Sequence, residues 1–538
     1  MKKWILNNLK FILILIFLVL ITYANALNNA FVSDDIAEIA KNPNISDIST
    51  ITTRPFNFIR IIFYWISFNL GGLNPLFFRL INYFFHLGSV LVVFALLSKM
   101  YTKRFAFFVA AIFAVHPSFS EAVIWISGGT YPQYTFFFLL SLLFYIFSKE
   151  RKKYYWFSIL SFLLALMSHS QMSLPLFVIF PIYELSFGNL RKNLLKVTPF
   201  FLLSLVYLGV TFASLPERTN TLQSVHYQEG GLDNPFIQIP IAISSYFELI
   251  FWPQVLTLYH SELAFGPVNF AIRAVVTLAL FAIIGWSFIK NKQIFFWLSL
   301  FLVTLSPTLT PFKLTWIVAE RYLYLASLGI IIPVMLFMER IIKKIRINNL
   351  DLYLSIVIVT LFIIRTFTRN IDWKNEDNLW IATGKTSPSS PNTHNNLGDV
   401  YGRWGDKQKA LEEFQTAIAL KPNYADAYHN LANTYREVGE IDKALENYHK
   451  AIEFNPKLWQ SYQNIASIYF QDKDYDKTLE YMEGALKISP QNIGLYSNLG
   501  IVYLYKGDKE KAKEIFNQVL AVDPQNQFAR QGLVEANK

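Results

Sequence analysis

The fold of the C-terminal part follows from residues 422–455, which read PNYADAYHNLANTYREVGEIDKALENYHKAIEFN. The same pattern recurs every 34 residues, and its opening proline is repeated at Pro388, Pro422, Pro456, Pro490 and Pro524. Three further columns with this spacing are Leu397, Leu431, Ile465 and Leu499; Ala410, Ala444, Thr478 and Ala512; and Phe414, Tyr448, Met482 and Phe516. Small residues let two helices approach closely, aromatic residues fill the gap, and proline closes each unit. Glycine marks the turn in three units, and Lys473 takes its place in the other.

A 34-residue helix–turn–helix period of this pattern resembles the tetratricopeptide repeat. Four units exceed the roughly three needed to bury a shared core. Such a solenoid presents a concave surface for peptides or other partners. The repeats contain no recognisable set of catalytic residues, and their aromatic columns are expected to form the core.

The composition of the whole chain indicates a membrane protein. Of 538 residues, 53% are hydrophobic, only 16% are charged and 49 are Phe. A soluble globular chain carries about 25% charged residues, so a disordered, collagen-like or ordinary soluble protein is excluded. Cysteine is absent, which excludes a disulfide framework, a thiolate nucleophile and a cysteine metal site.

Charge is distributed unevenly along the chain. Residues 388–538 hold 17 Lys and Arg against 20 Asp and Glu, a net charge of −3, so the overall +10 arises from a net +13 in residues 1–387. Because positive loops orient membrane spans, this excess predicts topology rather than nucleic-acid binding. It places the N-terminus in the cytoplasm and the repeats outside. The high content of Asn, Lys, Ile and Phe without Cys suits an AT-rich prokaryote, so we expect a prokaryotic inner or plasma membrane.

Eleven apolar segments are candidate spans, since a spanning helix needs about 20 mostly apolar residues. They lie near 8–27, 77–98, 105–120, 131–148, 155–168, 172–187, 197–214, 266–289, 294–311, 318–340 and 350–367. A further apolar stretch, 238–256, is open to crossing, re-entering or lying in the interface. The sequence therefore predicts an all-α protein. Residues 1–367 form a polytopic domain of about 11 spans, 368–390 a linker and 391–538 the repeat solenoid.

Familiar catalytic motifs are missing. The chain has no phosphate-binding glycine loop, no H-E-x-x-H helix and no G-x-S-x-G turn, so nucleotide hydrolysis, zinc proteolysis and serine hydrolysis lack support. The eight histidines are scattered without ligand spacing. We expect no dedicated metal site, although a carboxylate pair could hold a divalent cation.

Two adjacent carboxylates, Asp34 and Asp35, follow the first apolar span. Carboxylates at a membrane surface are costly unless they are hydrated or paired. In the functional interpretation one is a general base for an acceptor hydroxyl or amide, and the other orients it. The structural alternative is a solvated loop start or a helix N-cap, where Asp is favoured.

Other polar clusters map to the same membrane face under this topology. They are Arg54-Pro55, the segment from His116-Pro117 to Glu121, and Glu320-Arg321-Tyr322. Arginine suits phosphate because its charge is permanent and its donors form a fork. As structural alternatives, His116 could end a helix before Pro117, and Arg321 could pair with Glu320. The convergence of these clusters favours a site where a hydrophilic headgroup meets the membrane.

Together these residues resemble the transmembrane and tetratricopeptide-repeat O-mannosyltransferases. The first block is Phe31-Val32-Ser33-Asp34-Asp35 with Asn42-Pro43 and Arg54-Pro55, and it is followed by Gly71-Gly72-Leu73-Asn74-Pro75. Later blocks are His116-Pro117 with Glu121, Glu320-Arg321-Tyr322-Leu323-Tyr324, and Arg369-Asn370 with Trp373-Lys374. The blocks occur in order along nearly the whole chain.

The resemblance implies a GT-C-type glycosyltransferase that takes a sugar, mannose or similar, from a polyprenyl-phosphate carrier on the extracytoplasmic side. It implies that Asp34 or Asp35 is the catalytic acidic residue. Arg321 and Arg54 would bind the donor phosphate, an electrostatic role. His116, Glu121, Glu320 and Tyr322 would shape the substrate pocket. The repeats would hold a protein or peptide acceptor.

Two competing functions remain. One is a non-enzymatic membrane-anchored scaffold for envelope protein assembly, which should tolerate loss of Asp34 and Asp35. The other is a transporter, which is disfavoured because charged residues collect at one face rather than along a midplane pathway.

Overall fold

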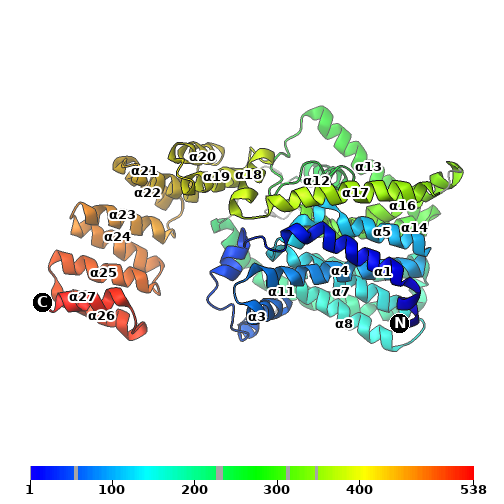
Figure 1. Ribbon diagram of the computed structural model, residues 1–538, viewed down its shortest axis with the longest axis horizontal. Helices are drawn as coiled ribbons and strands as arrows, with labels where there is room; N and C mark the ends of the chain where they lie inside the picture. Colours follow the sequence, from blue (N-terminus) through cyan, green and yellow to red (C-terminus); the bar gives the residue numbers. More distant parts are fainter. Residues whose placement is uncertain (1, 54–57, 226–233, 310–315, 346–348) are drawn as a thin grey trace. The chain divides into compact units, whose positions relative to one another are not determined.

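The computed structural model describes residues 2–53, 58–225, 234–309, 316–345 and 349–538. The chain divides into two compact units, residues 1–387 and 388–538. The described residues are helices joined by turns and loops, without a strand, so the predicted all-α class is confirmed (Figure 1).

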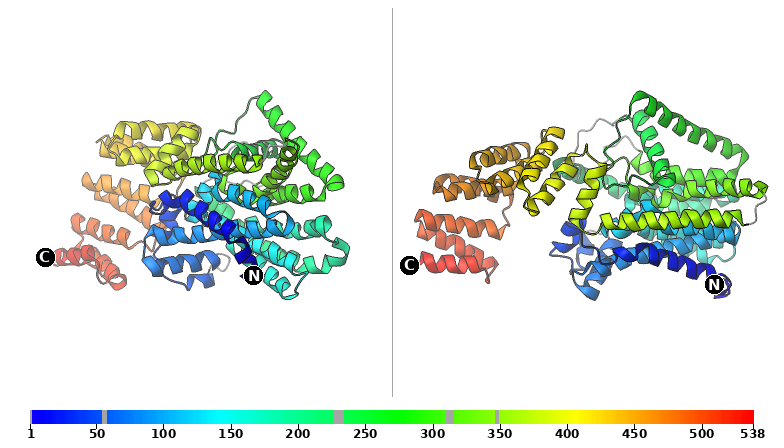
Figure 2. Two further views of the ribbon diagram at one scale, coloured as in Figure 1. Left: turned by 45° about the vertical axis from the view of Figure 1, so that its right-hand side comes forward. Right: turned by 45° about the horizontal axis from the view of Figure 1, so that its top comes forward.

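The first unit is a bundle of mostly apolar helices. Its long helices are α1 Lys2–Tyr23, α4 Pro75–Met100, α7 Thr130–Phe147, α11 Leu190–Val225, α13 Pro267–Lys290 and α17 Leu350–Asp372. The intermediate helices are α3 Phe58–Gly71, α5 Lys103–Val115, α8 Lys153–Ser168, α12 Pro235–Phe251, α14 Lys292–Leu305 and α16 Leu328–Ile345. Short helices are α2 Thr50–Thr53, α6 Ser120–Ile124, α9 Ser170–Ser173, α10 Ile179–Phe187, α15 Leu323–Ala326 and α18 Glu376–Thr386. Figure 2 shows α1, α4, α5 and α7 running along one another.

Helix α4 is the centre of this bundle. It packs against α3, α5 and α7, and α1 packs against α5 and α17. Asn74 begins α4 as an N-cap, because its side chain accepts a hydrogen bond from the backbone of Leu76 (3.0 Å) and Pro75 occupies the first helical position. A capped start fixes where the polar segment before α4 ends.

Five helices of the described residues are long and apolar enough to cross a membrane, and two bent pairs raise this to seven. The predicted number of eleven stays a prediction. The predicted span 172–187 is broken into α9, a 3-10 turn at Leu174–Val178 and α10. The stretch 238–256 forms α12, which ends before Trp252-Pro253.

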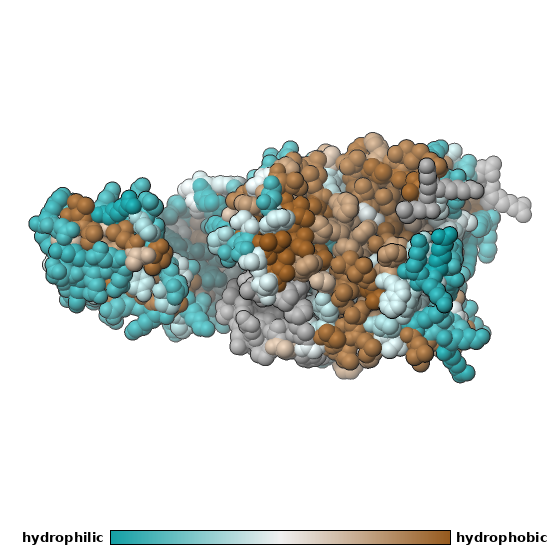
Figure 3. Space-filling model, turned by 90° about the horizontal axis from the view of Figure 1, so that it is seen from below, coloured by the Kyte–Doolittle hydropathy of each residue, from teal (hydrophilic) through white to brown (hydrophobic). Residues whose placement is uncertain are grey.

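The outer surface of the first unit supports a lipid environment. Large apolar side chains are solvent-exposed along its long helices, including Phe17 (60%), Val268 (75%), Leu278 (67%) and Leu361 (59%). The face seen in Figure 3 is largely hydrophobic over this unit, whereas the repeat unit is mostly hydrophilic there. An exposed apolar surface of this extent is typical of a protein surface that contacts lipid or another apolar partner. A bilayer would cover these side chains.

The predicted linker 368–390 is helical instead. Helix α17 continues to Asp372, and α18 covers Glu376–Thr386. Trp373 and Leu379 are fully buried within the first unit, and Trp380 is nearly so. This segment is therefore part of the bundle, because its aromatic residues pack into the core.

The second unit consists of antiparallel helix pairs. They are α19 Pro391–Arg403 with α20 Lys407–Leu420, α21 Ala425–Glu437 with α22 Ile441–Phe454, α23 Trp459–Gln471 with α24 Tyr475–Ile488, and α25 Ile493–Lys506 with α26 Lys509–Val522. A last helix, α27 Gln527–Ala536, packs on α26 and α25. The aromatic column is core, since Phe414, Tyr448, Met482 and Phe516 are at most 3% exposed. Gly405, Gly439 and Gly507 adopt positive φ at the turns, and so does Lys473 (62°).

Candidate active site

The first segment after α1 carries the acidic pair, and the structure separates its two members. Asp35 is fully buried, whereas Asp34 is exposed. Ser33 between the span and the pair has a φ of +54°, so the backbone turns sharply there. The Asp35 side chain makes no N-cap bond to the turn that follows. The structural alternative of a helix N-cap therefore does not describe Asp35.

Asp35 is held by Ser127. Its Oδ1 accepts hydrogen bonds from the Ser127 backbone N–H (2.8 Å) and hydroxyl (2.6 Å). Burial raises the pKa of Asp35 to about 7, against the opposing effects of the Ser127 hydrogen bonds and of Arg79. Asp35 thus ties the first segment to the loop after α6. Its carboxylate has little freedom to meet a substrate.

Arg79 fixes the backbone of the same segment. Its buried guanidinium donates to the carbonyls of Leu27 (3.0 Å), Asn29 (2.8 Å), Ala30 (3.1 Å) and Ile124 (2.9 Å). The sequence patterns did not single out Arg79. An arginine inside the apolar stretch 77–98 nevertheless indicates a functional residue, because charged residues are rare within membrane spans and usually have a function.

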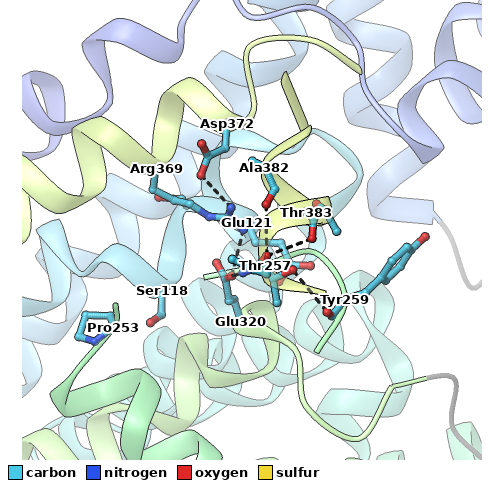
Figure 4. A network of polar contacts seen from close by, with 12 residues as sticks. Ser118, Glu121, Pro253, Thr257, Tyr259, Glu320, Arg369, Asp372, Ala382 and Thr383 are labelled. Atoms are coloured by element: carbon cyan, nitrogen blue, oxygen red, sulfur yellow. Dashed lines mark hydrogen bonds and ion pairs between the residues drawn. The ribbon is translucent and has the colours of Figure 1, made fainter. Parts of the chain in front are cut away.

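Two buried ion pairs hold the later polar clusters, and Figure 4 shows the one between Glu320 and Arg369. Glu121 on α6 pairs with the Arg321 guanidinium and also accepts the Arg321 backbone N–H (2.8 Å). Glu320 pairs with Arg369 on α17 (3.0 Å), and Arg369 also binds Asp372 (3.0 Å). The structural alternative for Arg321, an ion pair with Glu320, is therefore not what the structure contains.

The bends in two helix pairs bring these groups together. The pair Lys103–Val115 and Pro117–Ile124 bends by 55°, and so does the pair Glu320–Ala326 and Leu328–Ile345. Pro117 explains the first bend, since proline cannot continue the preceding helix. Both bends turn polar residues toward α17 and the first segment.

His116 has a structural role in this arrangement. Its ring is fully buried, Nε2 lies 3.1 Å from the Ile250 carbonyl, and Nδ1 accepts the Ser118 backbone N–H (3.3 Å). Both ring nitrogens are thus occupied by backbone groups. These contacts favour the alternative that His116 ends the helix before Pro117.

Tyr322 and Arg321 form a partly exposed surface beside the ion pairs. The Arg321 guanidinium lies 5.0 Å from the Tyr322 ring centroid and 5.6 Å from that of Trp125, and its side chain is 13% exposed. Arg321 therefore keeps one face toward aromatic rings while Glu121 balances its charge. Arg54 lies outside the described residues. The nearby Arg60 pairs with Glu38 (2.9 Å).

The loop after α12 closes the site, and the sequence did not single it out. Tyr259 stacks on Trp316 with ring centroids 4.2 Å apart. Thr257 is tied to Ser387 by a hydroxyl–hydroxyl bond (2.7 Å), and its backbone N–H donates to Glu320. Burial, together with the positive charges of Arg369 and Arg321, lowers the pKa of His260 to about 3. His260 is therefore neutral.

Acidic and basic groups both act on the Tyr259 phenol. Burial raises the pKa of this phenol, the Asp34 carboxylate raises the pKa further, and Arg321 lowers it. The charges of Asp34 and Arg321, which are 287 positions apart in the sequence, therefore both act on Tyr259.

Among the residues that the structure describes, no group of three or more His, Asp or Glu side chains is placed to hold a metal ion. The expectation about a dedicated metal site stays a prediction. The Ser127 hydroxyl contacts the carboxylates of both Asp35 (2.6 Å) and Glu38 (3.4 Å).

Comparison with known proteins supports the predicted resemblance. Tetratricopeptide-repeat family models match residues 405–439, 425–458 and 460–525. Protein O-mannosyl-transferase F38B6.6 of Caenorhabditis elegans is 25% identical over 460 residues, covering 78% of this chain and 64% of that protein. Human protein O-mannosyl-transferase TMTC3 is 25% identical over 479 residues, covering 77% of this chain and 52% of that protein.

The chain thus spans between about half and two thirds of the length of these relatives. Among solved structures, the crystal structure of MamA protein is 24% identical, with 29% of this chain and 83% of that chain covered and a TM-score of 0.25. Residues 405–525 are tetratricopeptide repeats, and the chain as a whole is similar, over more than three quarters of its length, to protein O-mannosyl-transferases.

Proposed function

We propose that this chain is a membrane glycosyltransferase that moves a sugar, mannose or similar, from a polyprenyl-phosphate carrier to an extracytoplasmic protein acceptor. The similarity to protein O-mannosyl-transferases supports a transferase acting on protein. The long apolar helices suit a lipid-linked donor. In this proposal the N-terminus is cytoplasmic and the repeats are extracytoplasmic.

The observation that carries the proposal is that Arg321 is held by Glu121 yet stays partly exposed beside the rings of Trp125 and Tyr322, while Asp34 is exposed. Transfer from a sugar phosphate needs a base for the acceptor and a cation for the leaving phosphate. In this proposal Asp34 is the base and Arg321 is the cation.

The roles then divide as follows. The Asp34 carboxylate takes the proton of an acceptor hydroxyl while the oxygen of that hydroxyl bonds to the anomeric carbon of the sugar. The bond from that carbon to the phosphate oxygen breaks, and the phosphate leaves with the electron pair. Arg321 neutralises the phosphate charge. Glu121 positions Arg321, and Asp35 positions the segment that carries Asp34.

This division makes the two aspartates experimentally distinct. Asp34→Asn should lower transfer by roughly 10²–10⁴-fold, the usual contribution of a general base. Asp35→Asn should retain most activity, because an amide oxygen can still accept from Ser127. The assay uses the purified full chain in lipid nanodiscs, with polyprenyl-phosphate mannose or other sugars and secreted proteins as acceptors.

The result also decides between enzyme and scaffold. Wild-type transfer with equal activity in a folded Asp34→Asn variant would refute Asp34 as the base. Absence of transfer with every donor, together with unchanged envelope glycosylation in a deletion strain, would leave the non-enzymatic scaffold. Thermal unfolding of each variant serves as the folding control.

A further inference from the structure

Helix α13 carries an arginine inside an otherwise apolar span. Figure 1 shows this helix at the edge of the first unit. It is long and apolar enough to cross a membrane, and only 17% of its most apolar window is buried. Arg273 nevertheless lies in its second turn, far from the terminal Lys290. Because a charged side chain within a span is costly, it usually has a partner or a ligand there.

Arg273 lines a pocket of about 320 Å³ between α12 and α13. This volume is the room of roughly ten water molecules. None of the lining residues belongs to the candidate active site described above. They are Ser244, Phe247 and Glu248 of α12, Phe265 of the loop, and Asn269, Ile272, Arg273 and Val276 of α13.

The guanidinium of Arg273 is fixed in this pocket before any ligand binds. Its Nη1 atom donates to the hydroxyls of Ser244 (2.7 Å) and Ser245 (3.3 Å). The group also lies over the Phe265 ring, 3.7 Å from the centroid, and its side chain is only 12% exposed. Among the described residues, its Nε atom has no hydrogen-bond partner. The guanidinium therefore keeps a donor for an anion, and a phosphate suits it.

A carboxylate stands next to this cation. The Nη2 atom of Arg273 donates to Glu248 (2.8 Å), whose side chain is 61% exposed. The pocket thus presents a positive and a negative group side by side. Glu248 would repel a ligand that carries a phosphate alone, whereas it would attract an ammonium group bound next to that phosphate. Charge complementarity therefore favours a zwitterion.

The surroundings of the pocket suit a lipid. The contact between Glu248 and Arg273 brings the end of α12 and the start of α13 to one membrane face. Trp252, just after α12, is 73% exposed, and tryptophan is enriched where a membrane meets water. On α13 beside the pocket, Ile272 and Val275 are 57% and 64% exposed. Polar groups at headgroup level and apolar side chains for acyl chains thus lie together.

We propose that this pocket binds a zwitterionic phospholipid with a primary ammonium group, as in phosphatidylethanolamine. The lipid phosphate contacts Arg273 and the amide of Asn269, and the ammonium group donates to Glu248. The acyl chains lie along Ile272 and Val276. The site is separate from the proposed sugar transfer, and the inference does not rest on it.

The bound lipid joins α13 to a helix that contacts the candidate active site. The Ser118 hydroxyl donates to the Leu249 carbonyl of α12 (2.8 Å), and the His116 ring contacts the Ile250 carbonyl (3.1 Å). A lipid held between α12 and α13 therefore stabilises an element on which the segment after α5 packs. We expect this lipid to raise the unfolding temperature of the purified protein.

The test measures lipid binding to the delipidated full chain in detergent by native mass spectrometry. The probes are dioleoyl-phosphatidylethanolamine, dioleoyl-phosphatidylcholine and dioleoyl-phosphatidylglycerol, which share their acyl chains. The choline headgroup keeps the positive charge without an N–H donor, and the glycerol headgroup has no cation. Inorganic phosphate and polyprenyl phosphate serve as competitors. Matched variants are Glu248→Gln in the pocket and Glu262→Gln, an exposed carboxylate of the neighbouring loop outside it.

We expect wild type to bind phosphatidylethanolamine roughly tenfold more tightly than phosphatidylglycerol and several-fold more tightly than phosphatidylcholine, because only its ammonium group donates to Glu248. Glu248→Gln should lower ethanolamine-lipid binding to the choline-lipid level and strengthen glycerol-lipid binding. Glu262→Gln should change none of these affinities. Arg273→Met should weaken all three lipids, since it removes the phosphate contact.

Equal binding of the three lipids by wild type, or an ethanolamine preference that survives Glu248→Gln, would overturn the inference. Displacement of the lipid by inorganic phosphate would show a general anion site instead, and tighter binding of polyprenyl phosphate would assign the pocket to that lipid. Thermal unfolding checks that each variant is folded. If Arg273→Met is not folded, Glu248→Gln decides alone, because its side chain is exposed.

Discussion

At the scale of single residues, the site depends on which carboxylates and cations are buried. Asp35 and Glu121 are both fully buried, and both act through a partner, Ser127 and Arg321 respectively. Asp34, next to Asp35 in the chain, is exposed. In the proposed function the buried acidic groups therefore have positioning roles and Asp34 is the base, because a carboxylate held by a partner is less free to take a substrate proton.

Asp35 should give the protein a characteristic pH dependence. Its pKa is about 7 in the folded chain against an ordinary 3.8, so the folded state binds the proton more tightly. The protonated Asp35 carboxyl therefore contributes fully to the free energy of unfolding below about pH 4, and this contribution is lost as pH rises through about 7. Asp35→Asn imitates the protonated acid. Its thermal stability in detergent should fall less than that of wild type between pH 5 and pH 8.

The matched control for this comparison is Asp34→Asn, since that side chain is exposed. Its stability should follow pH as the wild type does. If the thermal stability of both variants depended on pH as that of wild type does, the buried Asp35 carboxylate would not be the cause of the pH dependence.

At the scale of elements, bends and turns decide where side chains point. The bend at His116-Pro117 carries Glu121 to Arg321, and the bend before α16 carries Glu320 to Arg369. In the repeats, glycine provides the left-handed turn that joins the two helices of a unit. The third repeat has Lys473 there instead, at a φ of 62°.

Lys473→Gly should therefore stabilise the repeat unit. A non-glycine residue in the left-handed region costs about 1–2 kcal/mol, part of which glycine returns through its greater unfolded-state entropy. We expect a net gain of roughly 0.5–1 kcal/mol, measured by urea unfolding of the full chain with tryptophan fluorescence. The reciprocal change Gly439→Ala should destabilise by about 1 kcal/mol. Destabilisation by Lys473→Gly, or stabilisation by Gly439→Ala, would contradict the turn argument.

At the scale of the whole molecule, the two units differ in surface character. The first unit has an apolar surface and a polar site, and the second has a mostly hydrophilic surface and a groove. In the proposed function the repeats hold the acceptor, because tethering raises the local concentration of the acceptor at a membrane-bound site.

The absence of cysteine allows a direct test of topology. Single cysteines at Lys152, between α7 and α8, and at Gln525, in the repeats, are both exposed. The positive-inside rule predicts that a membrane-impermeant maleimide labels intact cells only at Gln525→Cys. Lys152→Cys should react only after the cells are opened. Labelling of Lys152→Cys in intact cells would reverse the orientation.

The sequence by itself determined the helical class and the repeat solenoid, and the comparisons and structure confirm both. These properties depend on local periodicity and composition, which the chain carries in every segment. The sequence also indicated candidate site residues, because charged residues next to apolar spans are uncommon. These candidates include Asp34, Asp35, Glu121, Glu320 and Arg321. The loop at Thr257–His260 and the arginine at position 79 were missed, since no short pattern marks them.

Only the tertiary structure decided the partners. Glu121 meets Arg321 across 200 positions and Asp35 meets Ser127 across 92, while Glu320 turns to Arg369 rather than to its neighbour. The segment predicted as a linker contains α18, because Trp373 and Leu379 are buried in the core of the first unit. Pairings of this kind depend on how helices bend and pack in three dimensions, and that information is not contained in the spacing of residues along the chain.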